Sequence, residues 1–292
     1  MKSNLVLCGF GVGIATLTSA SPYLIGNSIN LFLGGDSLYL YTLAGAAFFL
    51  IATPPFKLAA NIYLQKTASK TRFMLKKVIL NHLLGGSFGH TQKPGQWIEL
   101  VDGDVDGSMY LYHSLYFDIS LNCSIISVAL FITAFYHPLL ALAPLSGLLY
   151  ALVVYLATRR ASRSLYDEYV QHNTVTIGAI CEHLYNAKPY TNRAKLDIKN
   201  IERLAFRSSL KASTFESISC SCYPVAIVVL LLASAHLLSA GNFNIGAIFA
   251  SAIYLDRVLS PAASLISIYY SSREASYRRS RIRGYGLQHE RH

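Results

Sequence analysis

Apolar residues gather in six windows along the chain, each long enough for a helix that crosses a membrane. Such a helix needs about 20 apolar residues, because the hydrocarbon core is about 30 Å thick and a helix rises about 1.5 Å per residue. We therefore predict an all-α membrane protein whose six transmembrane helices lie at Leu5–Phe32, Leu38–Ile62, Asp118–Ala134, Leu139–Ala157, Ser219–Leu238 and Ile245–Ser271. The first window is too long for a removable signal peptide.

The segments between these windows differ sharply in length: three are tight turns, and two are long and polar. The turns are Leu33–Ser37, Phe135–Leu139 and Ser239–Asn244, and the long segments are Tyr63–Phe117 and Thr158–Ile218. Both long segments favour helix, and each is interrupted by a run that contains Gly, Pro or Asn, as is typical of a turn. We therefore expect helices two to five to continue beyond the membrane as two long helical hairpins.

The charge distribution predicts the orientation of the chain. Of its 292 residues, 53% are hydrophobic and 14% are charged, whereas soluble domains usually carry about 25% charged residues. None of the 25 Lys and Arg lies in the three tight turns. Since cytoplasmic loops carry the excess of Lys and Arg, we expect both hairpins and both termini to be cytoplasmic, in a plasma (inner) membrane. The net charge of +10 then reflects insertion into lipid, and nucleic acid is not expected as a partner.

Charged residues inside the windows are candidates for a solute pathway. A charge at the centre of a bilayer costs at least a few kcal/mol, so Asp256, Arg257 and Lys57 are expected to face a cavity or a partner. Tyr254 is a fourth candidate, as an aromatic side chain beside this pair. Alternatively, Asp256 and Arg257 each pair with another helix for packing, and Lys57 extends towards the cytoplasmic interface.

Several short motifs, in order along nearly the whole chain, resemble those of a known family. They are Pro22–Gly26, Gly95–Asp106 with its Asp-Val-Asp ending, Glu182-His183-Leu184, Gly241–Gly246, Leu259-Ser260-Pro261 and Arg281-Ile282. Together with the six windows, the short outer turns and the long inner hairpins, they resemble the transmembrane domain of exporter-type (type IV fold) ABC transporters. The resemblance implies one such domain at 1–283, followed by a basic tail at 284–292.

The resemblance also implies a function. Two copies of the chain, or one copy with a related transmembrane subunit, would form the paired bundle of a transporter. ATP and Mg²⁺ would bind to separate nucleotide-binding subunits, because the chain has no Gly-x-x-x-x-Gly-Lys-Ser/Thr phosphate loop. We therefore expect a permease subunit that moves a solute by alternating access, with no catalytic residue and no cofactor of its own. No His pair has the spacing of metal ligands, and no metal is expected.

The two hairpin tips are where the resemblance implies contact with the nucleotide-binding subunits. The first tip carries the only Trp of the chain within an apolar set, which is typical of an interface anchor. The coupling candidates are Trp97, Ile98, Val101, Asp104 and Val105 on the first tip, and Lys188, Tyr190 and Arg193 on the second. Alternatively, the acidic residues of the first tip cap a turn that packs on itself.

Two other functions remain open. One is a proton-gradient-driven peptide or antibiotic transporter of the same fold without ATPase subunits, in which Asp256 or Glu216 would titrate. It is favoured by Leu100, where the family commonly has Arg, and by Pro189, which would break a regular coupling helix. The other is a membrane scaffold that transports nothing, in which a change at Arg257 would harm assembly rather than solute flux.

Overall fold

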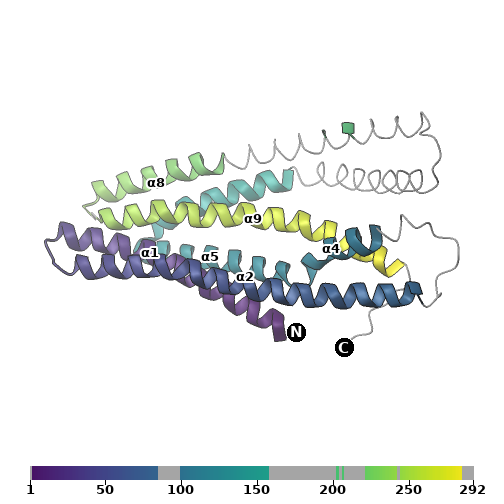
Figure 1. Cartoon of the computed structure of the whole chain (residues 1–292). Coiled ribbons are helices and arrows are strands. Elements are labelled where there is room, and N and C mark those ends of the chain that lie inside the picture. The colour runs from purple at the N-terminus through teal and green to yellow at the C-terminus, as the bar shows by residue number, and fades with distance from the viewer. Residues whose placement is uncertain are drawn as a thin grey trace. The chain divides into compact units, whose positions relative to one another are not determined.

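The computed structural model describes residues 2–84, 99–157, 202–203, 206, 221–241 and 244–284. These residues form helices and turns, with no strand among them. The helices are α1 (Lys2–Leu33), α2 (Tyr39–Leu84), a π-helical segment (Glu99–Asp104), α4 (Val105–Ser108), a 3-10 turn (Met109–Leu111), α5 (Ser114–Tyr136), α8 (Cys222–Ser239) and α9 (Ile245–Gly284), as drawn in Figure 1. A further helix covers Pro138–Ala157.

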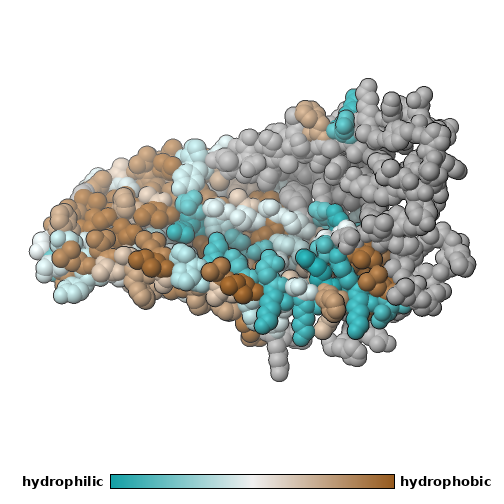
Figure 2. Space-filling view, in the orientation of Figure 1, coloured by the Kyte–Doolittle hydropathy of each residue, from teal (hydrophilic) through white to brown (hydrophobic). Residues whose placement is uncertain are grey.

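Six helices in the described part of the chain are long and apolar enough to cross a membrane. They are Ser3–Leu33, Tyr39–Asn81, Val105–Tyr136, Pro138–Ala157, Cys222–Ser239 and Ile245–Ser280. Figure 2 shows the apolar surface that these helices carry in brown. The chain is therefore a multi-pass membrane protein, and the prediction of an all-α chain with six such helices is confirmed.

The tight turns occur where the hydropathy pattern predicts them. In the first, Gly35 has a φ of 72°, a left-handed conformation that favours glycine, and Asp36 Oδ1 accepts a hydrogen bond from the backbone N–H of Leu38 at 3.0 Å. In the second, His137 alone is extended between α5 and the helix that begins at Pro138. The third contains Gly241, whose φ is 77°.

Helices α2 and α9 run well past the predicted apolar windows. α2 is continuous for 46 residues and ends at Leu84, well beyond Ile62, where its apolar window ends. At about 1.5 Å per residue it is about 69 Å long. α9 is continuous for 40 residues. Each helix is therefore longer than the hydrocarbon core of a bilayer, about 30 Å. The turn of the first predicted hairpin, and all of the second except 202–203 and 206, lie outside the described residues.

The chain divides into two compact units. Unit 1 consists of Met1–Thr67, Tyr112–Val153 and Ser219–Ser271, and unit 2 consists of Ala68–Leu111, Val154–Ile218 and Ser272–His292. The core of unit 1 contains three apolar clusters, which join α8 and α9 to the helix Pro138–Ala157, α1 to α2 and α5, and α5 to α9. Alanine is common in these clusters, as expected where membrane helices approach each other closely.

In unit 1, α1 and α9 meet at a pair of glycines. A Cβ atom on Gly246 would lie 1.9 Å from the carbonyl oxygen of Gly26, and one on Gly26 would lie 2.6 Å from the carbonyl oxygen of Gly246. The backbone N–H of Gly246 also donates a hydrogen bond to Asn30 Oδ1 at 2.9 Å. The first turn of α9 is therefore fixed against α1 at the end of unit 1 where the tight turns lie.

Candidate functional site

Asp256 lies on an exposed face of α9, well inside the apolar part of that helix. Along the helix axis, Asp256 lies about 16 Å from the first residue of α9, which is roughly half the thickness of a hydrocarbon core. The exposed residues of this face recur every three or four positions and are small or polar. They are Ala252, Asp256, Ser260, Ala263, Ser267 and Ser271, which we call the polar face of α9.

The exposed surfaces of the other spanning helices differ from this polar face. They carry large apolar side chains with high exposed fractions, such as Ile51 (73%) on α2 and Phe131 (71%) on α5. Such side chains suit contact with lipid tails. From Ala252 to Ser271 this face carries no large apolar side chain, whereas nearer the start of α9 the same side of the helix exposes Phe249 (49%) and Ile245 (37%). The exposed surface of α9 is therefore apolar at its start and polar from Ala252 onward.

The two charges of α9 differ in exposure, because Asp256 is exposed and Arg257 is half-buried. In the part of the chain that the structure describes, no ion pair joins Asp256 to Arg257.

Tyr254, the aromatic candidate for the pathway, is fully buried, with an exposed fraction of 0%. Its hydroxyl donates a hydrogen bond to the carbonyl oxygen of Ser19 on α1. The side chain therefore lies between α1 and α9 rather than on the polar face of α9.

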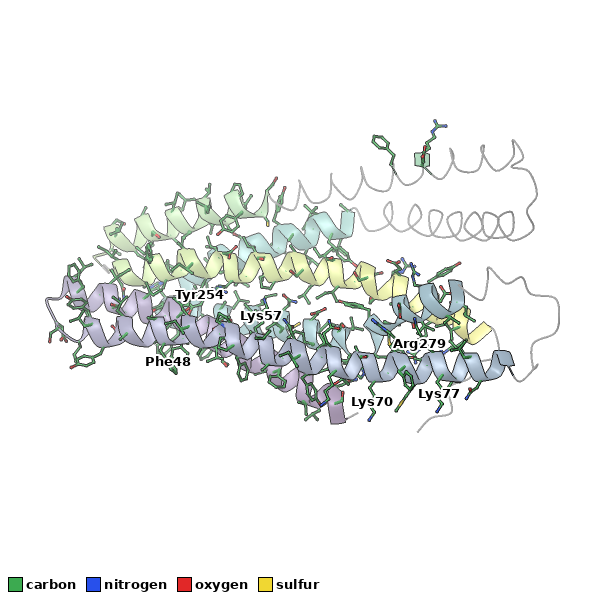
Figure 3. The ribbon with its side chains drawn as sticks, in the orientation of Figure 1. Phe48, Lys57, Lys70, Lys77, Tyr254 and Arg279 are labelled. Atoms are coloured by element: carbon green, nitrogen blue, oxygen red, sulfur yellow. The ribbon has the colours of Figure 1, made fainter. Side chains whose placement is uncertain are left out.

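Lys57 is exposed on α2, two residues after the Pro54-Pro55 pair (Figure 3). The preceding residue, Phe56, packs against Phe10 of α1 with 5.5 Å between the ring centroids. Among the described residues, no ion pair joins Lys57 to Asp256. The structure thus places Asp256 and Arg257 next to each other on α9 and gives no contact between them and Lys57.

The coupling candidates of the first predicted tip have varied surroundings. Val101 is half-buried, whereas Asp104 and Val105 are buried in unit 2, with exposed fractions of 1% and 0%. Trp97 and Ile98 lie outside the described residues. The candidates of the second tip, Lys188, Tyr190 and Arg193, also lie outside the described residues.

The structure shows contacts around the first tip that sequence reasoning missed. Asp106 Oδ1 forms ion pairs with two residues of α2: Arg72, whose Nε lies at 3.1 Å, and Lys76, whose Nζ lies at 3.6 Å. On the α9 side, Arg278 Nη1 donates a hydrogen bond to the carbonyl oxygen of Gly103 at 3.0 Å. The Asp-Val-Asp motif had already singled out Asp106 as a residue of interest. The contact of Gly103 uses only its backbone carbonyl group, which no sequence pattern can reveal.

Two further observations concern cofactors and relatives. Within the described ranges, no three His, Cys, Asp or Glu side chains are grouped so that they could hold a metal ion. No protein family and no curated protein matches the chain in sequence.

Proposed function

We propose that the chain is the transmembrane (permease) subunit of an exporter-type ABC transporter. It moves a solute across a plasma (inner) membrane by alternating access, and separate nucleotide-binding subunits bind Mg²⁺-ATP and hydrolyse it. The observation that carries this proposal is Asp256, a charge on an exposed polar face deep within a membrane-spanning helix.

The cost of placing a charge in lipid supports a pathway along α9. A carboxylate at the centre of the bilayer costs about 3 kcal/mol on insertion scales and more in simulations of isolated helices. The polar face of α9 therefore turns towards water or another protein rather than towards lipid. A second copy of the chain, or a related subunit, completes the path on the opposite side. Arg257 gives the path a mixed charge that suits an amphipathic solute.

The basic residues support a cytoplasmic location for unit 2. α2 contains no Asp or Glu in its 46 residues. Lys70 and Lys77 project from one side of α2, away from the neighbouring helices (Figure 3). By the positive-inside rule, the end of α2 that carries Lys70 and Lys77 stays in the cytoplasm. There the nucleotide-binding subunits contact Trp97, Ile98 and Val101 on the first tip and Lys188–Lys195 on the second, since Asp104 and Val105 are buried in unit 2.

The subunit composition and the water access of α9 test the proposal together. The complex is purified gently from native membranes, and ATP hydrolysis is measured with and without vanadate. We expect a P-loop subunit to accompany the chain and vanadate to inhibit the turnover. In a cysteine-free background, we expect a membrane-impermeant thiol reagent to label Ser260→Cys and not Ile51→Cys. Equal labelling at both positions would show that the polar face of α9 is not a water-exposed path.

A proton-driven transporter of the same fold is the second candidate. It is favoured by the burial of Leu100 (0% exposed), an apolar side chain where the resembled family commonly has Arg. In this case the chain purifies as a dimer without ATPase activity. An imposed pH gradient across reconstituted vesicles then changes the labelling of Ser260→Cys, and Asp256→Asn abolishes that change.

A further inference from the structure

The segment Glu99–Leu111 of unit 2 is an irregular piece of chain between two regular helices. It contains a π-helical part, the single turn α4 and a 3-10 turn, and it lies beside α2 and α9 (Figure 1). Its apolar side chains are well packed. Among the described residues of unit 2, the buried apolar side chains are Leu100, Val105 and Met109 from this segment, Leu75 and Ile79 from α2, and Ala275 and Ile282 from α9.

The contact with α2 is made by exposed charges. Asp106 pairs with Arg72 and Lys76, and the Arg72 and Asp106 side chains are 46% and 42% exposed. Ion pairs with this much access to water contribute little to stability. The Asp106 contact therefore contributes little to holding the segment against α2.

The contact with α9 has a more restrictive geometry. Arg278 Nε and Nη2 both donate to Glu274 Oε1, at 3.2 Å and 2.8 Å, while Nη1 donates to the Gly103 carbonyl oxygen at 3.0 Å. Glu274 lies one turn before Arg278, and their side chains are 42% and 34% exposed, so this pair adds little stability and serves to orient the guanidinium from within α9. A planar guanidinium holds its donors in a fixed fork, so it binds a carboxylate and a carbonyl group at once in one defined geometry, whereas the three donors of a lysine ammonium have no fixed orientation.

Gly107 makes this arrangement sterically possible. A Cβ atom at position 107 would lie 2.1 Å from Arg278 Cδ and 2.6 Å from its Nε. Any larger residue at 107 would push the Arg278 side chain away from Gly103. Arg278 makes this contact and Gly107 leaves the space for it, so a substitution at either residue disrupts it.

We propose that Arg278 is a positioning residue that holds residues 99–108, the first part of this segment, against α9. We call this contact the lock. The segment directly follows the predicted coupling residues Trp97 and Ile98, and α9 is the helix that carries Asp256. A force on the segment is thereby passed to the pathway helix. This transmission rests on the proposed function, whereas the lock itself does not.

The lock is tested first by amide hydrogen exchange on the purified full-length chain. We expect Arg278→Ala and Gly107→Ala each to speed exchange of 99–108 by about tenfold, because loss of a charge-assisted contact opens the segment locally. Arg278→Lys should lie between these variants and the native chain. Arg283→Ala on the same helix and Gly9→Ala, whose added Cβ would meet nothing within 4 Å, serve as matched controls. Unchanged exchange in both Arg278→Ala and Gly107→Ala would overturn the lock.

Transmission is tested in the assembled complex. ATP should change the rate at which an impermeant thiol reagent labels Ser260→Cys, and Arg278→Ala and Gly107→Ala should abolish that change while vanadate-sensitive hydrolysis continues. A loosened segment with an unchanged ATP response would refute transmission. If the complex containing native Arg278 and Gly107 has no ATPase partner, the proposed function fails and transmission fails with it. The exchange measurement still decides whether the lock exists.

Discussion

The hydroxyl of Tyr254 on α9 donates a hydrogen bond to the carbonyl oxygen of Ser19 on α1. One turn further along α1, the carbonyl oxygen of Tyr23 accepts a second bond, from the hydroxyl of Tyr136 on α5 at 3.0 Å. Pro22 lies between the two carbonyl groups, and its ring removes one backbone donor from α1. Two tyrosines from different helices therefore hold α1 at the proline that interrupts its hydrogen bonding.

The first prediction concerns Tyr254→Phe, which removes the hydroxyl and keeps the buried ring. We expect a loss of about 1 kcal/mol of stability, because interhelical hydrogen bonds in membrane proteins contribute about that amount. Thermal unfolding in detergent measures the loss. Tyr41→Phe is the control, since Tyr41 is 77% exposed. An equal effect of the two substitutions would mean that the bond to Ser19 adds nothing to stability.

The second prediction concerns the glycine pair between α1 and α9. Gly246→Ala places a methyl group against the backbone of Gly26, and we expect it to destabilise unit 1 by about 3 kcal/mol or more, the upper range for overpacking. The same thermal assay applies, with Gly9→Ala as the control because its added methyl group has free space. Near-native stability of Gly246→Ala would show that the two helices separate easily.

The third prediction concerns Asp106→Asn, which removes both ion pairs with α2. We expect a loss of less than about 1 kcal/mol at low salt, because both partners of the Arg72 pair are exposed to water. The loss should disappear near 1 M salt, where the screening length falls to about 3 Å. Unfolding measured at two salt concentrations separates this result from a structural role for Asp106, which would be independent of salt.

The fourth prediction concerns Asp256→Leu and separates a transporter from a scaffold. We expect thermal stability to remain within about 0.5 kcal/mol of the native value, as is usual for exposed positions, because Asp256 is exposed. Labelling of Ser260→Cys by an impermeant thiol reagent should fall, since an apolar side chain repels water from this face. Strong destabilisation would instead favour the scaffold function. Asp36→Asn in the first tight turn controls for loss of a carboxylate.

The spanning helices and their turns were predictable because the bilayer imposes simple rules. Lipid tails require an apolar stretch of fixed length, and a tight turn between such stretches favours residues like Gly35 and Asp36. These rules act over short stretches of sequence, so the chain displays them directly. They also explain why the six predicted windows coincide with helices of the structure.

The contacts between distant residues were not predictable. Arg278 binds the Gly103 carbonyl group, and Tyr254 binds that of Ser19, but a carbonyl group is present at every residue and carries no signal. Hydropathy also cannot distinguish an apolar side chain that awaits a partner from one that the chain already buries. Val105 illustrates this ambiguity, because we expected it at an exposed tip and the structure buries it in unit 2.

The contact between Gly26 and Gly246 makes the first turn of α9 a fulcrum. If α9 tilts about this contact, the displacement of each residue grows with its distance from Gly246, and the hydrogen bond from Tyr254 to Ser19, close to the contact, limits the tilt. A tilt of about 5° would move Asp256 by about 1.3 Å but Ser271 by about 3.3 Å, taking about 1.5 Å of length per residue from Gly246. A gap between the polar face of α9 and whatever packs against it would therefore be narrow near Gly246 and widest near Ser271, where α9 leaves unit 1.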